Sequence, residues 1–325
     1  MGKKSFIIKR IIQMLITLFL LVTIVFLMFR LLPGDPLAMY INTDMPVEVQ
    51  KTLMHRFGLD KPLHEQYLLY LKNLLVGDFG QSFHYGEAVI YLVAERFWNT
   101  IILMGIGIGL AYVMGCILGA LAAWKRGSKF EVISIILTLS IRSAPLFWIG
   151  IILIMIFGIW LNLLPLGGIR EAGIKITSTF EKFFSLDFLV HMILPATTLA
   201  IYYMGTPFLI MRSAMLEVMN EEFIEIVKAK GLKTWQVIFK HAMRNSLLPV
   251  ITMLTVMISF VMGGQVMLET IFRWPGIGME IVSAVNTRDY PMAQALFIMM
   301  GVIILIVNFV VDLLYHYLDP RVTYE

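Results

Sequence analysis

The charged residues that are most informative about function lie in one stretch of this chain, from Glu222 to Gly231. Its acidic residues come first and its lysines last, an order that suits the dipole of a short helix. Asn220 precedes the stretch as a potential N-cap, and Gly231 is well placed as the left-handed residue that ends it. The pattern predicts a charged amphipathic helix between two strongly apolar spans. We expect a water-soluble partner to bind the chain at this helix.

This helix should present two different faces. Phe223, Ile226 and Val227 follow the i, i+3, i+4 spacing of an apolar stripe. The charged residues that lie opposite that stripe are Glu222, Glu225 and Lys228. The alternative is an ordinary amphipathic helix that lies at the lipid interface.

Catalytic signatures are missing from the sequence. It contains no GxxxxGK[ST] phosphate loop, no HExxH and no GxSxG motif. Its six His residues are scattered, and Cys116 is its one cysteine. We therefore expect no catalytic residues, no metal site and no disulfide framework.

The elements that position the charged helix must be membrane helices. Hydrophobic residues make up 59% of the 325 residues and charged residues only 15%, with a mean hydropathy of +0.82. This composition is typical of polytopic helical membrane proteins. The net charge of +4 does not indicate nucleic-acid binding, because no dense basic stripe is interleaved with aromatics.

Six spans of the length that a bilayer requires are expected, so the predicted fold is all-α. Their approximate ranges are 11–32, 97–124, 132–160, 190–216, 247–268 and 292–317. The first is too long for the apolar region of a signal peptide and is interpreted as a retained span. Glycines recur along the second span and predict close helix packing there; they are Gly105, Gly107, Gly109, Gly115 and Gly119.

The distribution of Lys and Arg predicts the orientation of these spans. One set of connecting segments holds 14 basic and eight acidic residues, whereas the opposite set holds 11 basic and 14 acidic residues. The side with the basic surplus should face the cytoplasm, which places both termini inside.

With this orientation, two long segments lie on the extracytoplasmic side of the membrane. Residues 33–95 are too many for a passive connector and predict a small folded cap, with helical patterns near 47–57 and 64–75. Residues 161–189 form the second. The stretch 274–278 predicts a turn, with Trp274 at the membrane interface.

A series of short motifs, in order and suitably spaced, resembles the first-type membrane subunit of the dipeptide/oligopeptide/nickel family of ABC importers along essentially the whole chain. The motifs read RLLPGDP at 30–36, GLDKPL at 58–63, GDFGQS at 77–82, PLFWIG at 145–150, AKGL at 229–232, HAMRNSLLP at 241–249, ETIF at 269–272, WPGIG at 274–278, RDYP at 288–291 and DPR at 319–321. Each motif alone is weak evidence, whereas the ordered set is specific.

The chain departs from the pattern in two respects. The wider superfamily writes its coupling motif as Glu-Ala-Ala, three residues, then Gly. Here Glu225 and Gly231 fit, but Ile226 and Val227 replace the alanines. Arg142 occupies a position in the third span where a small or apolar residue is expected.

The resemblance implies a type I ABC importer permease fold with six transmembrane helices and a large extracytoplasmic loop after the first. Residues 1–96 would form the first helix and cap, 97–317 a five-helix core with a coupling loop at about 219–246, and 318–325 a cytoplasmic tail. The chain would reside in a bacterial or archaeal cytoplasmic membrane.

The same resemblance implies partners: a related second permease subunit, two cytosolic ATP-binding subunits that hold ATP and Mg, and an extracytoplasmic solute-binding protein. The chain itself would bind no cofactor and would perform no chemistry. The residues implied in coupling to the ATPases are Glu222, Phe223, Glu225, Ile226, Val227, Lys228, Ala229, Lys230, Gly231 and Leu232.

Polar residues at the depth of the spans are candidates for the translocation path. They are Arg142, Tyr202, Tyr203, Gln265 and Asn308. An intramembrane cation is costly and often functional, but Arg142 could instead be held by carbonyls freed at Pro145 or by Asp312. The other four could instead form hydrogen bonds between packed helices.

Peptides are the expected substrate, and nickel or another small solute is the alternative within the same family. An ion-driven secondary transporter is the alternative from another class. Such carriers favour paired midplane carboxylates and repeated halves, neither of which the sequence offers.

Overall fold

The computed structural model describes residues 3–31, 61–174, 179–261 and 265–318. Apart from an isolated antiparallel bridge between Gln81 and Ala88, the described residues form only helices and connecting segments. The longer helices are α1 (Lys3–Leu31), α3 (Leu63–Leu75), α4 (Val89–Trp124), α5 (Lys129–Ser143), α8 (Leu186–Tyr203), α9 (Gly205–Val218), α12 (Leu247–Val261), α14 (Ile277–Asn286) and α15 (Tyr290–Leu318). The shorter ones are α6 (Leu146–Leu153), η1 (Ile154–Trp160), α7 (Thr179–Phe184), α10 (Glu222–Ala229), η2 (Gln236–Ala242), α11 (Met243–Asn245) and α13 (Val266–Ile271).

Four of the described helices are long and apolar enough to cross a bilayer: α1, α4, α8 and α15. The pair α5 and α6–η1 meets the same test together, but the two halves are bent by 104°. The fifth expected span falls on the shorter apolar stretch Leu247–Ile258 of α12. An all-α membrane protein is thus confirmed, while the presence of six membrane spans remains a prediction.

The bend corrects the expectation of one continuous third span over 132–160. Ala144, which precedes Pro145, has extended backbone angles of φ −79° and ψ 147°. The proline ring disfavours the helical conformation at the residue before it, so α5 ends there and α6 starts in a new direction. The fourth expected span is likewise divided, between α8 and α9.

The chain separates into two compact units. Unit 1 comprises Met1–Asn99 and Gly276–Phe309, and unit 2 comprises Thr100–Pro275 and Val310–Glu325. The expected helix near 64–75 is present as α3, whereas the one near 47–57 lies outside the described residues.

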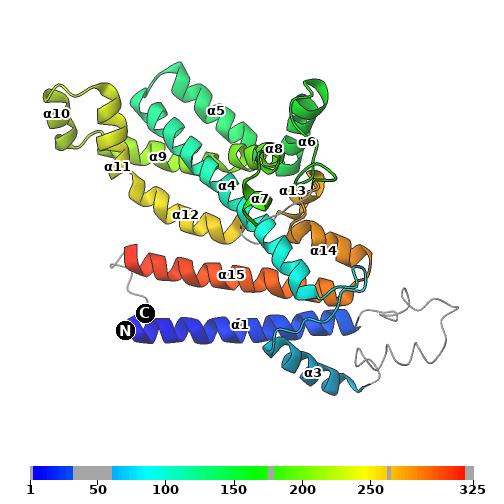
Figure 1. Cartoon of the computed structure of the whole chain (residues 1–325). Helices are drawn as coiled ribbons and strands as arrows, with labels where there is room; N and C mark the ends of the chain where they lie inside the picture. The colour runs from blue at the N-terminus through cyan, green and yellow to red at the C-terminus, as the bar shows by residue number, and fades with distance from the viewer. Residues whose placement is uncertain (1–2, 32–60, 175–178, 262–264, 319–325) are drawn as a thin grey trace. The chain divides into compact units, whose positions relative to one another are not determined.

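Unit 1 is built on α1, which runs beside α3 and the first part of α15 (Figure 1). Val22, Val25 and Ile298 form its small buried cluster. Tyr67 connects α3 to α1, because its hydroxyl lies 2.6 Å from Oγ1 of Thr23.

Buried carboxylates fix the loops of unit 1 in an arrangement we call the acidic corner, made of Ser82, Tyr85, Arg96, Glu280 and Asp289. Asp289 is fully buried and accepts hydrogen bonds from the Ser82 hydroxyl and from the backbone N–H of His84 and Met292. The motifs at 77–82 and 288–291, more than 200 residues apart, meet at this carboxylate.

The second carboxylate of the corner is Glu280. It accepts a hydrogen bond of 2.9 Å from Nε of Arg96 and one of 3.0 Å from the Tyr85 hydroxyl. Burial and the neighbouring Glu280 charge raise the pKa of Tyr85, so the phenol stays protonated and donates.

Unit 2 packs α4 closely against α8 and α9 through small residues. A Cβ on Gly107 would clash with Leu199, and one on Gly115 or Gly119 would clash with the backbone of α9 or the residue before it. The predicted close packing is confirmed for these three glycines, whereas Gly105 and Gly109 face open space.

Trp274 corrects another expectation. Instead of lying at a membrane interface, it is fully buried in unit 2, with its ring centroid 5.6 Å from that of Phe188. Its large apolar area stabilises the core more than its indole N–H would stabilise an interface.

Candidate functional site

The charged stretch at 222–231 folds as predicted, into a short helix. Helix α10 runs from Glu222 to Ala229, with Lys230 as its C-cap. Gly231 adopts φ +71°, and a Cβ added there would meet no atom within 4 Å, so the backbone conformation, and not crowding, requires glycine. Figure 1 shows α10 at the tip of unit 2, beyond the ends of α9 and α11.

The predicted N-cap was wrong. Glu221 occupies the capping position without a side-chain cap hydrogen bond, and the Asn220 amide instead donates to the carbonyl of Leu216. The acidic residues Glu222 and Glu225 in the first turn are left to complement the positive end of the helix.

The buried face of α10 also differs from the predicted stripe. Ile224 is fully buried, and Phe223 and Val227 are half-buried against the same core. Ile226 is 56% exposed. Because helix η2 contributes Val237 and Ile238 to that core, α10 rests on its own chain through most of its apolar side chains.

The exposed face of α10 is therefore mainly charged. It carries Glu222, Glu225, Lys228 and Lys230, with Ile226 as its exposed large apolar side chain. Ala229 and Gly231 are exposed, and Leu232 is half-buried. Two carboxylates and two ammonium groups around one isoleucine form a surface suited to docking a polar protein partner.

A cation–π contact ties α10 to the end of a long helix. The Lys228 ammonium lies 5.7 Å from the ring centroid of Trp124, the last residue of α4. Such a contact contributes about 0.5–1 kcal/mol at an exposed site. Lys228 was predicted to face a partner, and in the structure it also holds α10 against α4.

The neighbouring helix ends are joined by an ion pair. Arg212 of α9 donates to Glu131 of α5 at 2.8 Å from Nε, and Gly127 donates its N–H to the same carboxylate at 2.6 Å. Ser128 caps α5 by accepting from the Glu131 N–H. This junction ties α5 to α9 and to the turn that follows α4.

Three residues of this region were missed from the sequence. Ile224 was overlooked because an i, i+3, i+4 pattern fits a stripe one residue displaced. Trp124 lies about a hundred residues away, and nothing local signals its contact with Lys228. Trp235, 57% exposed beside η2, carried a usable signal: a large aromatic in a polar loop.

The candidate path residues are only partly brought together. The Gln265 amide donates to the Tyr203 hydroxyl at 3.0 Å, and the rings of Tyr202 and Tyr203 meet edge to face at 4.9 Å. The hydrogen bond agrees with the alternative in which these polar groups pair within the packed protein. Asn308 belongs to α15, in unit 1.

Arg142 is exposed in the last turn of α5, just before the Pro145 bend. Among the described residues it has no hydrogen bond and no ion pair, so neither the freed carbonyls nor Asp312 holds it within this chain. An arginine at the depth of a span and open to lipid would be costly. Among the described residues nothing covers this face of α5, on which Arg142 is exposed.

Comparison with known proteins gives full-length matches. Residues 115–324 match the family described as binding-protein-dependent transport system inner membrane component, and residues 3–104 match the N-terminal region of such membrane components. The chain is 36% identical to the di/tripeptide transport system permease protein DppB of Pseudomonas aeruginosa, over 99% of both chains.

Two further relatives cover the chain as completely. The oligopeptide transport system permease protein AppB of Bacillus subtilis is 35% identical over 98% of this chain and 99% of its own length. The glutathione transport system permease protein GsiC of Escherichia coli is 31% identical over 99% of both chains.

Proposed function

The chain belongs to the family of binding-protein-dependent transport system inner membrane components, and from this premise we propose that it is a permease subunit of an ATP-driven peptide importer. The proposed substrate class rests on relatives named for dipeptides and tripeptides, for oligopeptides and for glutathione, a tripeptide. They match along almost the whole chain, so the likeness is not confined to one motif.

In this proposal α10 receives the motion of cytosolic ATP-binding subunits. The observation that carries it is the division of α10 into two faces. Ile224 anchors the helix in its own chain, while Ile226, Glu222 and Glu225 stay exposed. A partner that pulls on the exposed face moves the end of α4 with it, because Lys228 contacts Trp124.

The residues predicted for coupling take two roles. Phe223, Val227 and Leu232 pack inward and transmit displacement to the core. The docking surface consists of Glu222, Glu225, Ile226, Lys228, Ala229 and Lys230, and Gly231 ends the helix so that the chain can turn away.

The partners of the proposal are a second permease subunit, two ATP-binding subunits that hold ATP and Mg, and an extracytoplasmic solute-binding protein. Both termini and the loop at 219–246 would face the cytoplasm, as the distribution of basic residues favours. Segments 1–96, 97–317 and 318–325 would be the N-terminal helix with its cap, the transport core and the tail.

We assign the uncovered face of α5 to contact with the second permease subunit or the water-filled path. Arg142 supports this assignment, because it is exposed and unpaired within the described chain. Tyr202, Tyr203 and Gln265 would support the wall of that path, and Asn308 is a further candidate for it.

The central test changes Gly231, which the docking surface does not need for contact. In a reconstituted importer, Gly231→Val should abolish peptide uptake, since a β-branched residue at φ +71° distorts the end of α10 at a cost of about 1–3 kcal/mol. Gly231→Asn is the matched control, because Asn tolerates this conformation and should retain uptake.

Membrane insertion and co-purification of the other subunits should be unchanged in both variants. Full ATP-dependent uptake by Gly231→Val would refute the role of α10. Uptake by vesicles that contain this chain alone would refute the assignment to an ATP-driven importer.

A further inference from the structure

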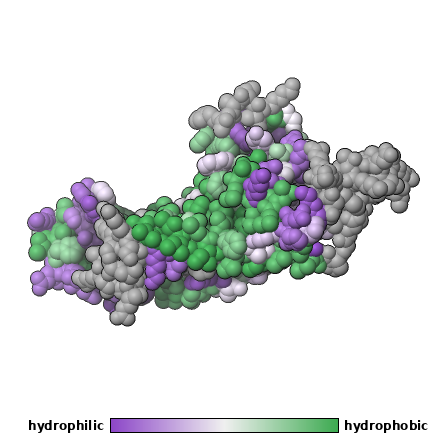
Figure 2. Space-filling view, turned by 90° about the horizontal axis from the view of Figure 1, so that it is seen from below, coloured by the Kyte–Doolittle hydropathy of each residue, from purple (hydrophilic) through white to green (hydrophobic). Residues whose placement is uncertain are grey.

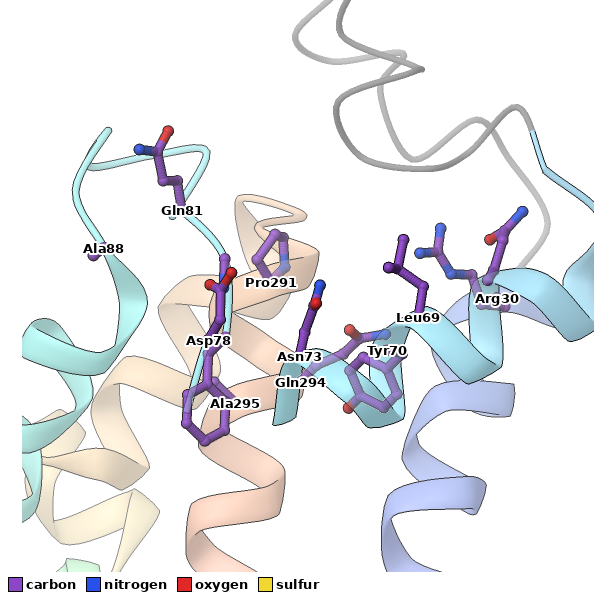
Figure 3. Close-up of a pocket in the computed structure, with 13 residues that line it drawn as sticks. Arg30, Leu69, Tyr70, Asn73, Asp78, Gln81, Ala88, Pro291, Gln294 and Ala295 are labelled. Atoms are coloured by element: carbon purple, nitrogen blue, oxygen red, sulfur yellow. The ribbon is translucent and has the colours of Figure 1, made fainter. Parts of the chain in front are cut away.

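Unit 1 contains a polar cavity that the transport mechanism does not use. It has a volume of about 400 Å³, which lies in the range of ligand sites. Its walls are the end of α1, one face of α3, the segment 78–88 and the start of α15 (Figure 3). The polar side chains that line it are Arg30, Gln66, Tyr70, Asn73, Asp78, Gln81 and Gln294.

Three of these side chains carry buried polar atoms that have no hydrogen-bond partner among the described residues. They are Nε of Arg30, Oε1 of Gln66 and the hydroxyl of Tyr70. Each such atom costs free energy unless something pairs with it. All three atoms belong to residues that line the cavity, so a polar ligand that enters it can supply the missing partners.

The charge of Arg30 indicates the sign of that ligand. Among the described residues no carboxylate pairs with Arg30, and its guanidinium carbon lies 5.6 Å from the centroid of the Phe26 ring. Burial raises the pKa of Tyr70 far above its usual range, so its phenol remains protonated and available to donate. A guanidinium and a phenol donor together suit an anionic oxygen, above all a phosphate.

The opposite wall of the cavity has the opposite charge. Figure 3 shows Asp78 across the cavity from Arg30 and Tyr70, with Asn73 and Gln294 between them. One oxygen of the Asp78 carboxylate accepts from the Gly80 N–H at 2.9 Å, which leaves its other oxygen for a ligand. A molecule with separate negative and positive groups fits this arrangement.

The surroundings of the cavity are those of a membrane interface. Arg30 lies in the last turn of the candidate span Ile7–Leu31. The surface next to it is apolar and exposed, with Met28, Leu31 and Leu68 all more than half exposed. Figure 2 shows hydrophobic side chains gathered over the face on which α1 lies. A ligand here can have its charged part in the cavity and a long apolar part along α1.

We propose that this cavity binds the headgroup of a membrane phospholipid, with its phosphate on Arg30 and Tyr70 and its ammonium towards Asp78. Gln66 accepts an N–H or hydroxyl of the same headgroup through Oε1. The acyl chains lie on the exposed apolar surface of α1. A bound lipid of this kind stabilises the junction of α1 and α3.

The test is native mass spectrometry of the full-length chain, purified in its native assembly in mild detergent and phosphate-free buffer. The unaltered protein should retain an adduct with the mass of phosphatidylethanolamine. Tyr70→Phe should lower retention about ten-fold, because a hydrogen bond to a charged group is lost. Tyr67→Phe, which removes the hydroxyl that contacts Thr23 outside the cavity, should leave retention unchanged.

A second pair of variants tests whether the positive charge of Arg30 is needed for lipid binding. Arg30→Gln should lower retention by at least about ten-fold, whereas Arg10→Gln, at the other end of α1, should not. Both proteins are checked for a normal elution profile and melting temperature, and Tyr70→Phe remains informative if Arg30→Gln fails to fold. Equal retention in the unaltered, Tyr70→Phe and Arg30→Gln proteins would overturn the proposal.

Reconstitution distinguishes binding of a phospholipid from binding of a free anion. Phosphatidylethanolamine in nanodiscs should raise the melting temperature more than phosphatidylcholine, whose quaternary ammonium has no N–H for Asp78, and Asp78→Asn should remove this preference. Inorganic phosphate added in detergent should give little stabilisation. Stabilisation by inorganic phosphate alone, without any lipid adduct, would identify the site as one for a small anion and overturn the proposal.

Discussion

The acidic corner and helix α10 both depend on carboxylates, but they use them in opposite ways. In the corner, Glu280 and Asp289 are buried, and each accepts two hydrogen bonds from residues far away in sequence. In α10, Glu222 and Glu225 are exposed, and an apolar residue, Ile224, anchors the helix. A buried carboxylate with many partners fixes loops in one arrangement, whereas an exposed one leaves its element free to meet a partner.

The largest effect should come from breaking the acidic corner. Glu280→Ala leaves Arg96, in a mostly buried site, with only the more exposed carboxylate of Glu95 at 3.8 Å, and should lower stability by about 3–5 kcal/mol. The measurement is the melting temperature of the purified protein. The double variant Glu280→Ala/Arg96→Ala should recover part of the loss, because no buried charge is then unpaired. If both variants melt like the unaltered protein, the corner does not fix the loops of unit 1.

The next effect compares two isoleucines of the same helix. Ile224→Ala empties a fully buried position and should destabilise the α10 region by about 2–5 kcal/mol. Ile226→Ala removes an exposed side chain and should leave the melting temperature nearly unchanged, while ATP-driven uptake falls. Hydrogen exchange of α10 and uptake by reconstituted vesicles measure the two outcomes. If Ile226→Ala transports normally, the exposed face of α10 is not the docking surface.

A smaller effect tests how α10 is tied to α4. Lys228→Met keeps much of the side-chain length but removes the charge over Trp124, which should cost about 0.5–1 kcal/mol. Lys230→Met, on the same exposed face, serves as the control for loss of a positive charge. Uptake that falls more in Lys228→Met than in Lys230→Met would assign the difference to the Trp124 contact, and equal losses would indicate only general electrostatics.

The smallest effect concerns pH at the corner. Tyr85→Phe removes a hydrogen bond to Glu280 and should lower the melting temperature slightly near neutral pH. Burial and the Glu280 charge raise the pKa of Tyr85, so the folded state holds this proton more tightly than the unfolded state. The stability that Tyr85 contributes is therefore lost as pH rises above about 10, where the unfolded phenol ionises. The deficit of the variant should shrink there, and a deficit independent of pH would contradict this assignment.

Local sequence patterns predicted the helices well and their contacts poorly. The composition predicted an all-α membrane protein, and the run of charges at 222–231 predicted α10 together with its glycine end. The same pattern placed Ile226 instead of Ile224 beside Phe223 and Val227 on the buried face, since periodicity cannot tell which neighbour the helix will rest on. The sequence analysis also placed Trp274 at the membrane interface, because a sequence does not show which aromatic side chains the core encloses.

Local patterns were enough to predict what local forces govern: apolar length, charge order along a helix, and the glycine at which α10 ends. Which distant groups share one site depended on the fold. Asp289 with Ser82, Lys228 with Trp124, and Arg30 with Tyr70 at one cavity each join segments that no periodicity relates. Such pairings depend on how whole helices pack, and packing is a property of the folded chain and not of any short stretch within it.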